Sequence, residues 1–155
     1  MTRSVLQLCG PSTGGIRRHV AVVTTMLRER GWRVVTAAPS GVLDGLDIDV
    51  SVVDVPNGMA PGPLLGAVRS FRRLGEFDII HAHGLKAGWV AVLARPSAPI
   101  VLTVHNVVLR SVAGRTASIQ RFLERAVVRR VDQVIAVSPE IVEHFGGVVA
   151  ADRIR

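Results

Sequence analysis

The sequence predicts an α/β domain of the doubly wound type, with a parallel sheet of about six strands and helices on both faces. Short Val/Ile/Leu runs alternate with segments of helical periodicity, which is typical of parallel strands buried on both faces. Four of these runs end in small or polar residues: VLQLC precedes GPSTGG, FDIIHA precedes HG, IVLTV precedes HN, and QVIAV precedes SPE. Because ligands bind outside the carboxyl ends of such strands, the pattern indicates a binding site at one edge of the sheet.

The first strand–helix unit is the clearest. Val5–Cys9 is predicted as a strand, Gly10–Gly15 as a loop and Ile16–Arg30 as a helix with one apolar stripe. Gly31 is suited to end this helix in a left-handed conformation. The second strand is predicted over Val34–Ala38.

The third strand is expected at Asp47–Val55, where apolar and polar residues alternate. This pattern predicts one apolar and one wetter face, with Ile48, Val50 and Val52 on the apolar one. Pro and Gly in Asn57–Pro63 then predict a loop.

The second half continues the same alternation. Strands are predicted over Ile79–Ala82, Ile100–Val104 and Val134–Val137, and helices over Leu64–Leu74, Leu85–Ala94, Arg115–Arg130 and from Pro139 onward. The apolar stripe expected on the helix over 115–130 consists of Ile119, Phe122, Leu123, Ala126 and Val127. Ala151–Arg155 predicts a turn into another strand, which suggests a fragment of a longer protein.

Length and composition restrict the class of protein. The 155 residues fit a single domain. The single Cys9 cannot form an internal disulfide, which favours a reducing compartment. No stretch approaches the roughly 18–20 apolar residues of a membrane span, and the N-terminal apolar run is shorter than that of a secretory signal. A soluble cytoplasmic protein is therefore expected.

The net charge of +7 arises from eighteen Arg and one Lys against twelve acidic residues. This charge suits phosphorylated metabolites, an anionic membrane or nucleic acid, although a compositional Arg bias explains it equally well. The chain has no Tyr and only four Phe and two Trp, so it offers little material for stacking on bases. Nucleic-acid binding is not expected.

The loop Gly10–Gly15 precedes a helix, whose free N–H groups and positive end can hold a phosphate. Gly14 and Gly15 would let a ligand approach the backbone closely, and Arg17 or Arg18 could add positive charge. GPSTGG is neither the dinucleotide-binding fingerprint nor a Walker A loop. A merely tight turn is the alternative.

The motif HAHG places His81 and His83 on the same side of a strand, with His83 nearer the binding edge. A ligand-facing His83 and a hydrogen-bonded structural pair are both open interpretations. A metal site is not expected, because no Cys or carboxylate cluster lies nearby in the sequence. His105 and Asn106 follow the next buried strand, where a neutral imidazole suits sugar hydroxyls or proton transfer. The alternative for His105 is a loop-capping role.

Ser138 is predicted to cap the last helix or to contact a ligand. His19 and His144 lie in helical stretches and are predicted to be surface or packing residues. Arg121, Arg125 and Arg129 repeat at helical spacing and form either a solvated face or a contact with anionic lipid head groups.

In order and spacing, these motifs resemble the N-terminal half of the GT-B glycosyltransferases, specifically the retaining family 4. The similar segments are STGGIRRHV, FDIIHAHG, IVLTVHN, VDQVIAVSPEIVEHF and the terminal DRIR. The resemblance implies that residues 1–155 form one Rossmann-like lobe on the acceptor side of a two-lobed enzyme. A C-terminal lobe, absent from this chain, would bind a nucleotide-diphosphate sugar as co-substrate. No other cofactor and no metal are implied.

By position, the resemblance assigns the reacting centre to His105, which is the candidate catalytic residue. The candidate substrate-binding residues are Gly14, Gly15, Arg17, His83, Gly84, Asn106 and Ser138. The acceptor would be a small molecule or a lipid-linked sugar. Because the missing lobe would supply most of the charge stabilisation, the isolated chain is not expected to transfer sugar.

The sequence leaves two other classes of function open. One is a non-catalytic α/β domain that docks on an anionic membrane or a protein partner through its Arg-rich helices, placing it at the inner face of the membrane. The other is an unrelated nucleotide- or flavin-binding domain. It is disfavoured because Ala38 and Pro39 stand where an acidic residue would hold a ribose.

Overall fold

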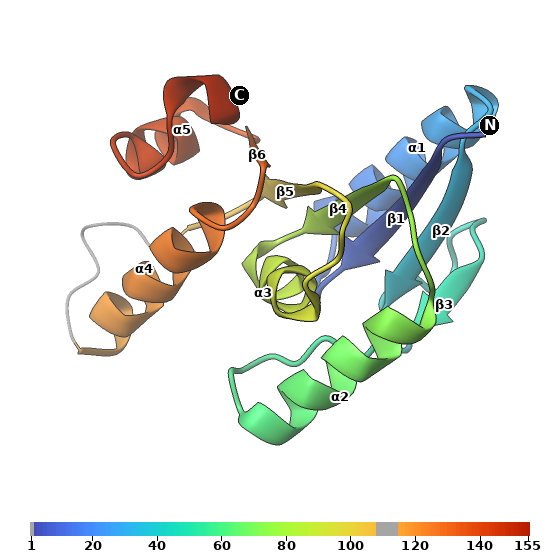
Figure 1. Ribbon diagram of the computed structural model, residues 1–155, viewed down its shortest axis with the longest axis horizontal. Coiled ribbons are helices and arrows are strands. Elements are labelled where there is room, and N and C mark those ends of the chain that lie inside the picture. The colour runs from blue at the N-terminus through green and yellow to red at the C-terminus, as the bar shows by residue number, and fades with distance from the viewer. Residues whose placement is uncertain (1, 108–114) are drawn as a thin grey trace.

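The computed structural model describes residues 2–107 and 115–155. Its sheet is entirely parallel and has the strand order β3-β2-β1-β4-β5-β6 (Figure 1). The strands are β1 (Ser4–Cys9), β2 (Arg33–Ala38), β3 (Val50–Val52), β4 (Ile79–His83), β5 (Ile100–Val104) and β6 (Gln133–Ala136). The helices are α1 (Gly15–Glu29), α2 (Pro61–Arg73), α3 (Leu85–Ala94), α4 (Arg115–Val128) and α5 (Pro139–Phe145). The predicted doubly wound class is confirmed.

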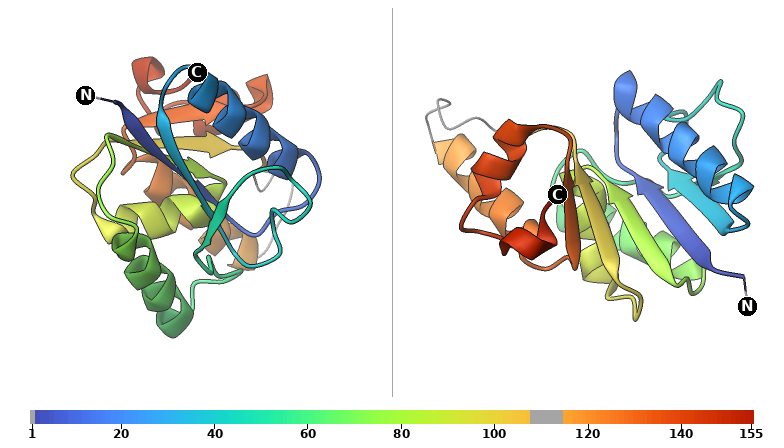
Figure 2. Two further views of the ribbon diagram at one scale, coloured as in Figure 1. Left: turned by 90° about the vertical axis from the view of Figure 1, so that its right-hand side faces the viewer. Right: turned by 90° about the horizontal axis from the view of Figure 1, so that it is seen from above.

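The winding direction reverses between β1 and β4. The chain runs outward from β1 through β2 to β3 and then returns to place β4 on the other side of β1. Seen from above, α1 lies at the β1–β2 end of the sheet and α4 and α5 at the β6 end (Figure 2). In an open α/β sheet, the carboxyl ends of the strands at such a reversal form a crevice that binds ligands.

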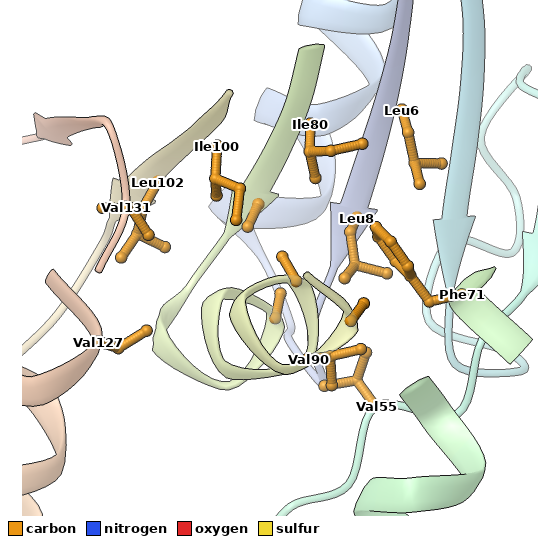
Figure 3. Packing of buried hydrophobic residues seen from close by; sticks show 14 of the residues in the cluster. Leu6, Leu8, Val55, Phe71, Ile80, Val90, Ile100, Leu102, Val127 and Val131 are labelled. Atoms are coloured by element: carbon orange, nitrogen blue, oxygen red, sulfur yellow. The ribbon is translucent and has the colours of Figure 1, made fainter. Parts of the chain in front are cut away.

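One face of the sheet carries the main core. Leu6, Leu8, Ile80 and Leu102 alternate with other residues along the central strands and pack against α3, with Phe71 of α2 beside them (Figure 3). Helices α4 and α5 add further side chains to this cluster. Helix α1 covers the opposite face, where a smaller cluster consists of Cys9, Val20, Ala38 and Leu43.

Helix α3 approaches β5 closely at Gly88. A Cβ atom at this position would lie 3.0 Å from Cδ1 of Leu102 and 3.3 Å from a methyl group of Val127. Both of those side chains are fully buried. The absence of a side chain at position 88 therefore allows the helix to lie directly on the apolar layer.

Two aspartates link neighbouring strands at the amino-terminal edge of the sheet. The Asp78 carboxylate accepts hydrogen bonds from Ser4 N at 2.7 Å and Ser4 Oγ at 2.8 Å, joining β4 to β1. The Asp132 carboxylate likewise accepts a hydrogen bond from Ile100 N at 2.7 Å, joining β6 to β5. The accepted bonds and the neighbouring Arg33 and Arg3 lower the pKa of Asp78. These contacts hold the register of the paired strands.

The prediction for the third strand is wrong in length and at Val52, whereas Ile48 and Val50 of the predicted apolar face do pack against the smaller core. Only Val50–Val52 pairs, because β3 is an edge strand with a single neighbour. Val52 is 58% exposed, whereas Val53 and Val55 are buried in the main core. The alternation therefore shifts by one residue where the chain leaves the sheet, with Val53 N still donating to Ala38 O.

The apolar stripe predicted for α4 is also wrong in part. Val127 is buried as predicted, but Ile119 is 61% and Phe122 is 69% exposed. The buried face instead includes Ala117, Glu124 and Val128. The C-terminal half of α4 faces α3 near Gly88, and this contact fixes the rotation of the helix about its axis.

The start of α2 and the C-terminal end of the chain can also be compared with the predicted boundaries. Helix α2 begins at Pro61, within the predicted loop, because proline is well tolerated at the first helical positions. At the other end of the chain, Ala151–Arg153 is a 3₁₀ turn and Ile154 then forms a parallel bridge to Val134. The predicted turn into another strand is confirmed. No helix among the described residues has the length and apolar character needed to cross a bilayer.

Candidate functional site

A cavity of about 600 Å³ lies at the carboxyl ends of β1, β4 and β5, where the winding reverses. Its wall includes the loop after β1, the segment before α2, the first turns of α3 and one side of α4. Of the predicted site residues, His83, Gly84 and Asn106 line it. The lining does not include His105, Gly14, Gly15, Arg17 or Ser138.

The face of the sheet opposite the main core is polar in its centre, which the sequence analysis did not predict. Gln7 of β1, His81 and His83 of β4 and Thr103 of β5 occupy this face. His83 Nε2 donates to Gln7 Oε1 at 2.5 Å, and His81 Nε2 shares a hydrogen bond of 2.8 Å with Thr103 Oγ1. Both histidines are thus held in fixed orientations by neighbouring strands.

Four histidines gather where α1 packs on this face of the sheet: His19 of α1 itself, His81, His83 and His105. The His83 ring centroid lies 4.1 Å from that of His81, 5.6 Å from that of His19 and 6.1 Å from that of His105. His19 and His105 are themselves 5.5 Å apart. The two imidazoles expected at the binding edge, His83 and His105, therefore lie together. His19 is exposed and its ring packs against both, which agrees with the prediction of a surface or packing residue.

Burial lowers the pKa of three of these histidines, His81, His83 and His105, and favours their neutral form. Desolvation, followed by the nearby His19 and His105, lowers the pKa of His81 to about 4. The pKa of His83 is held well below its ordinary value by desolvation and by the other three rings. Desolvation and His19 also lower the pKa of His105. A neutral imidazole can both donate and accept a hydrogen bond, which suits a hydroxyl-bearing ligand.

Several polar atoms of this cluster are buried without a hydrogen-bond partner among the described residues: Gln7 Nε2, His83 Nδ1 and His105 Nε2. Because His83 Nε2 donates to Gln7, its Nδ1 presents a lone pair. An unsatisfied buried polar atom costs about 1–3 kcal/mol, so the polar centre beneath α1 reduces the stability of the fold. His83 is the residue that belongs to both the cluster and the cavity.

Gly84 joins β4 to α3 in a conformation that favours glycine, with φ 88° and ψ 154°. A Cβ at this position would meet nothing within 4 Å, so any effect of a side chain comes from the backbone. We expect Gly84→Ala to lower the free energy of unfolding by about 1–3 kcal/mol, as measured by urea denaturation. Gly15→Ala is the matched control, because Gly15 also has open space around it and is helical. Equal effects of the two substitutions would contradict this expectation.

The glycine-rich loop is divided between the cavity and the surface. Gly10 and Ser12 line the cavity, whereas Gly14 and Gly15 are exposed and have nothing within 4 Å of an added Cβ. Gly14 begins α1 with φ 62°. The Arg17 guanidinium donates to the carbonyl oxygen of Asp44, across the smaller core. The space around positions 14 and 15 is open, and a ligand contact there stays a prediction.

At α5, the prediction for Ser138 as a helix cap is wrong, and that for His144 as a packing residue is confirmed. Ser138 occupies the position before α5, yet its side chain makes no capping hydrogen bond to the helix, contrary to the prediction. Its hydroxyl instead hydrogen-bonds the Glu140 carboxylate, which lowers the pKa of that group. His144 is buried, as a packing residue should be, and its Nε2 lies 3.2 Å from Glu124 Oε2.

The arginine repeat on α4 is not uniformly solvated. Arg129 is exposed, whereas Nε of Arg125 is buried without a partner among the described residues, and Arg121 donates to Ser118 Oγ at 3.3 Å. Across the described ranges, no group of three or more His, Cys, Asp or Glu side chains has a geometry that could hold a metal ion.

The sequence from residue 14 to residue 155 matches the glycosyl transferase 4-like domain. The chain belongs to this family. No curated protein matches it in sequence. Membership in this family agrees with the resemblance seen in the order of the sequence motifs. It does not favour the alternative of a non-catalytic domain that docks on a membrane.

Solved structures share the fold of this glycosyltransferase domain. Sucrose-phosphate synthase from Thermosynechococcus elongatus aligns with a TM-score of 0.73 at 21% identity, over 99% of this chain and 47% of that one. Anabaena HepE in complex with UDP and glucose aligns with a TM-score of 0.72 at 20% identity, over 99% of this chain and 43% of that one. UDP-N-acetylglucosamine 2-epimerase from Rickettsia bellii aligns with a TM-score of 0.74 at 10% identity, over 99% of this chain and 44% of that one. The chain thus spans less than half the length of these proteins.

Two residues near the candidate site were not singled out from the sequence. His19 lies one turn into α1, and only the packing of α1 on β4 reveals that its ring reaches His83. Lys86 lines the cavity from the first turn of α3. Lys86 could have been noticed in the sequence, because it is the single lysine of a chain whose other basic residues are arginines.

Proposed function

We propose that this chain is the acceptor-binding lobe of a retaining glycosyltransferase. The enzyme would transfer a sugar from a nucleotide-diphosphate sugar, its co-substrate, to an acceptor held in the cavity. The observation that carries this proposal is that His83, a buried neutral imidazole, lies where the cavity of a glycosyltransferase 4-like domain meets the histidine cluster. HepE, which shares the fold, is described in complex with UDP and glucose.

The proposed roles follow from where each group lies. His83 and Asn106 would hydrogen-bond acceptor hydroxyls, because both line the cavity. The Asn106 amide can donate and accept, whereas His83, whose Nε2 donates to Gln7, can only accept. His105, which follows β5 at the same edge of the sheet, would be the catalytic residue that faces the transferred sugar, as the family resemblance implies.

Gly14 and Gly15 would approach the donor diphosphate, since their backbone is open to a second lobe. Ser138 is a weaker candidate, because its hydroxyl already hydrogen-bonds the Glu140 carboxylate. Arg17 donates to Asp44 O through one terminal nitrogen, and its Nε is buried without a described partner.

A second lobe would bind most of the donor and stabilise the leaving diphosphate. We therefore expect no turnover when this chain alone is incubated with radiolabelled UDP-glucose and a panel of sugar acceptors. Turnover by the chain itself would contradict the proposed division between two lobes.

Binding tests the acceptor role directly. We expect glucose, mannose or galactose, added at millimolar concentration, to shift the NMR signals of His83, Gly84 and Asn106 of the isolated chain. Asn106→Ala should weaken this binding severalfold because it removes a hydrogen-bonding group from the wall. Ser97→Ala, at an exposed position remote from the cavity, is the control and should leave the affinity unchanged. Absence of any sugar-dependent shift at the cavity would overturn the acceptor role.

A further inference from the structure

Trp89 is one of only two tryptophans in the chain, which has no tyrosine and four phenylalanines. It lies in α3 and lines the cavity, as do Met59 from the segment before α2 and Leu123 from α4. Its ring is half-buried: part of it packs against the main core, and it also borders the cavity. These three side chains give the cavity an apolar wall with one flat aromatic surface.

The position of Trp89 on its helix explains this exposure. The buried side of α3 consists of Ala87, Gly88, Val90, Ala91 and Ala94. Trp89 lies at the margin of that side, four residues after Leu85, which also lines the cavity. Residues four apart on a helix are neighbours on its surface, so Leu85 and Trp89 border the cavity together. The guanidinium carbon of Arg130 lies 6.0 Å from the centroid of the Trp89 ring, and this contact restricts the orientation of the indole.

The polar groups of the cavity suit a neutral ligand that is rich in hydroxyl groups. Three amide side chains line it: Asn57, Asn106 and Gln120. An amide can both donate and accept hydrogen bonds, as a hydroxyl group can. The charged lining residues, Lys86 and Glu124, have opposite formal charges, and each has a partner within the chain. Lys86 Nζ donates to Asn57 Oδ1 at 3.1 Å, and Glu124 Oε2 lies 3.2 Å from His144 Nε2.

We infer that Trp89 is a further acceptor-binding residue, and that a neutral pyranose ring of the acceptor lies on its indole. The face of an aromatic ring carries partial negative charge, so it attracts the weakly positive C–H groups on one face of a sugar ring. The hydroxyl groups at the edge of the sugar ring then hydrogen-bond the amides. This inference rests on the proposed function and deepens it, because it names the residue that selects a cyclic acceptor over an open-chain one.

Methyl β-glucopyranoside is the probe for this contact. When it binds to the chain, we expect the NMR signals of its C–H protons to move upfield, because the indole ring current shields protons that lie over the ring. Trp89→Leu keeps an apolar side chain without an aromatic face, so it should abolish these shifts and weaken binding about tenfold. Trp89→Phe, which keeps a smaller aromatic face, should restore part of both.

Sorbitol tests the selection of a ring. It has hydroxyl groups like those of a hexose but no ring with a C–H face. We expect it to bind the parent chain about tenfold more weakly than the glucoside, and Trp89→Leu should remove most of this difference.

Trp32→Phe is the matched control, because Trp32 lies between α1 and β2 and outside the cavity. It should bind the glucoside with the affinity of the parent chain. Trp89 is then the single tryptophan, so its fluorescence should change with the glucoside concentration and give the same affinity. Circular dichroism and urea denaturation of Trp89→Leu distinguish a lost contact from a lost fold. The upfield shifts seen with the parent chain need no variant.

Three results would overturn the role of Trp89. One is a folded Trp89→Leu variant that binds the glucoside as tightly as the parent chain. The second is saturable binding that leaves the sugar C–H signals unmoved, and the third is equal affinity for sorbitol and the glucoside. If the glucoside shifts the Asn106 signal in any of these cases, the acceptor role stands and only the role of Trp89 fails. If no sugar shifts the cavity signals, the proposed function fails and this inference fails with it.

Discussion

Replacement of Leu102 by alanine is expected to lower the free energy of unfolding by about 2–5 kcal/mol. Leu102 is fully buried in the centre of β5, between the sheet and α3 (Figure 3). The substitution removes apolar contacts and leaves a cavity that the surrounding sheet cannot easily close. Urea denaturation, followed by circular dichroism, measures the effect. A loss below about 1 kcal/mol would show that the layer is more loosely packed than the structure indicates.

The same contact predicts a specific coupling with Gly88. In the parent chain, the benefit of Gly88→Ala for helix propensity, about 1 kcal/mol, is opposed by a Cβ atom 3.0 Å from Leu102 Cδ1. In the Leu102→Ala background the contact with Leu102 is gone and only the Val127 methyl group at 3.3 Å remains, so Gly88→Ala should be more favourable there than in the parent chain. A double-mutant cycle should therefore give a coupling energy of about 1 kcal/mol or more.

Gly66→Ala is the matched control for this cycle, because Gly66 is internal to α2 and has nothing within 4 Å of an added Cβ. It should raise stability by about 0.5–1 kcal/mol in either background. Additive effects of Gly88→Ala and Leu102→Ala would contradict the close approach of α3 to β5.

Acidification should destabilise the fold through the histidine cluster. The pKa of His81 falls from its ordinary 6.5 to about 4 in the folded chain, so the unfolded state binds the proton more tightly. The contribution to stability is complete above about pH 6.5 and is lost as the pH falls toward about 4. For His81 alone, the loss between about pH 7.5 and about pH 5 is on the order of 2 kcal/mol. His83, whose pKa is also lowered, adds to it in the same direction.

The comparison of urea midpoints at these two pH values measures this dependence. His81→Gln removes one titrating group and should reduce the difference between the two midpoints. The variant also alters the bond to Thr103, so its stability at the higher pH serves as its own reference. A parent protein with equal free energies of unfolding at both pH values would contradict the burial of neutral imidazoles.

The sequence allowed the fold to be predicted because most of its elements are strongly periodic. The predicted strand over Ile100–Val104 has the bounds that the structure shows, and that over Val34–Ala38 differs by one residue. Edge strand β3 could not be predicted well, because a three-residue ladder with one partner leaves little trace in the pattern. On α4, the apolar residues are numerous enough for two stripes, and only packing against α3 selects the buried one.

The candidate site was predictable where it follows strand ends and unpredictable where it depends on packing. His83 and Asn106 were found because they stand at the carboxyl ends of buried strands, and both line the cavity. The contact between His19 and His105 depends on how α1 crosses the sheet, which periodicity does not determine. The polar character of the face beneath α1 was equally hidden, since short strands with buried His and Gln still appear mainly apolar in sequence.

The aspartates at the amino-terminal edge have a consequence for how this domain can diversify. Asp78 and Asp132 prevent β4 and β6 from sliding along β1 and β5, at the edge of the sheet remote from the cavity. The spacing of the groups that would meet a ligand is thereby set by residues that never touch it. Loops at the opposite edge are left free to change in length and composition as new substrates are selected, because strand alignment does not depend on them.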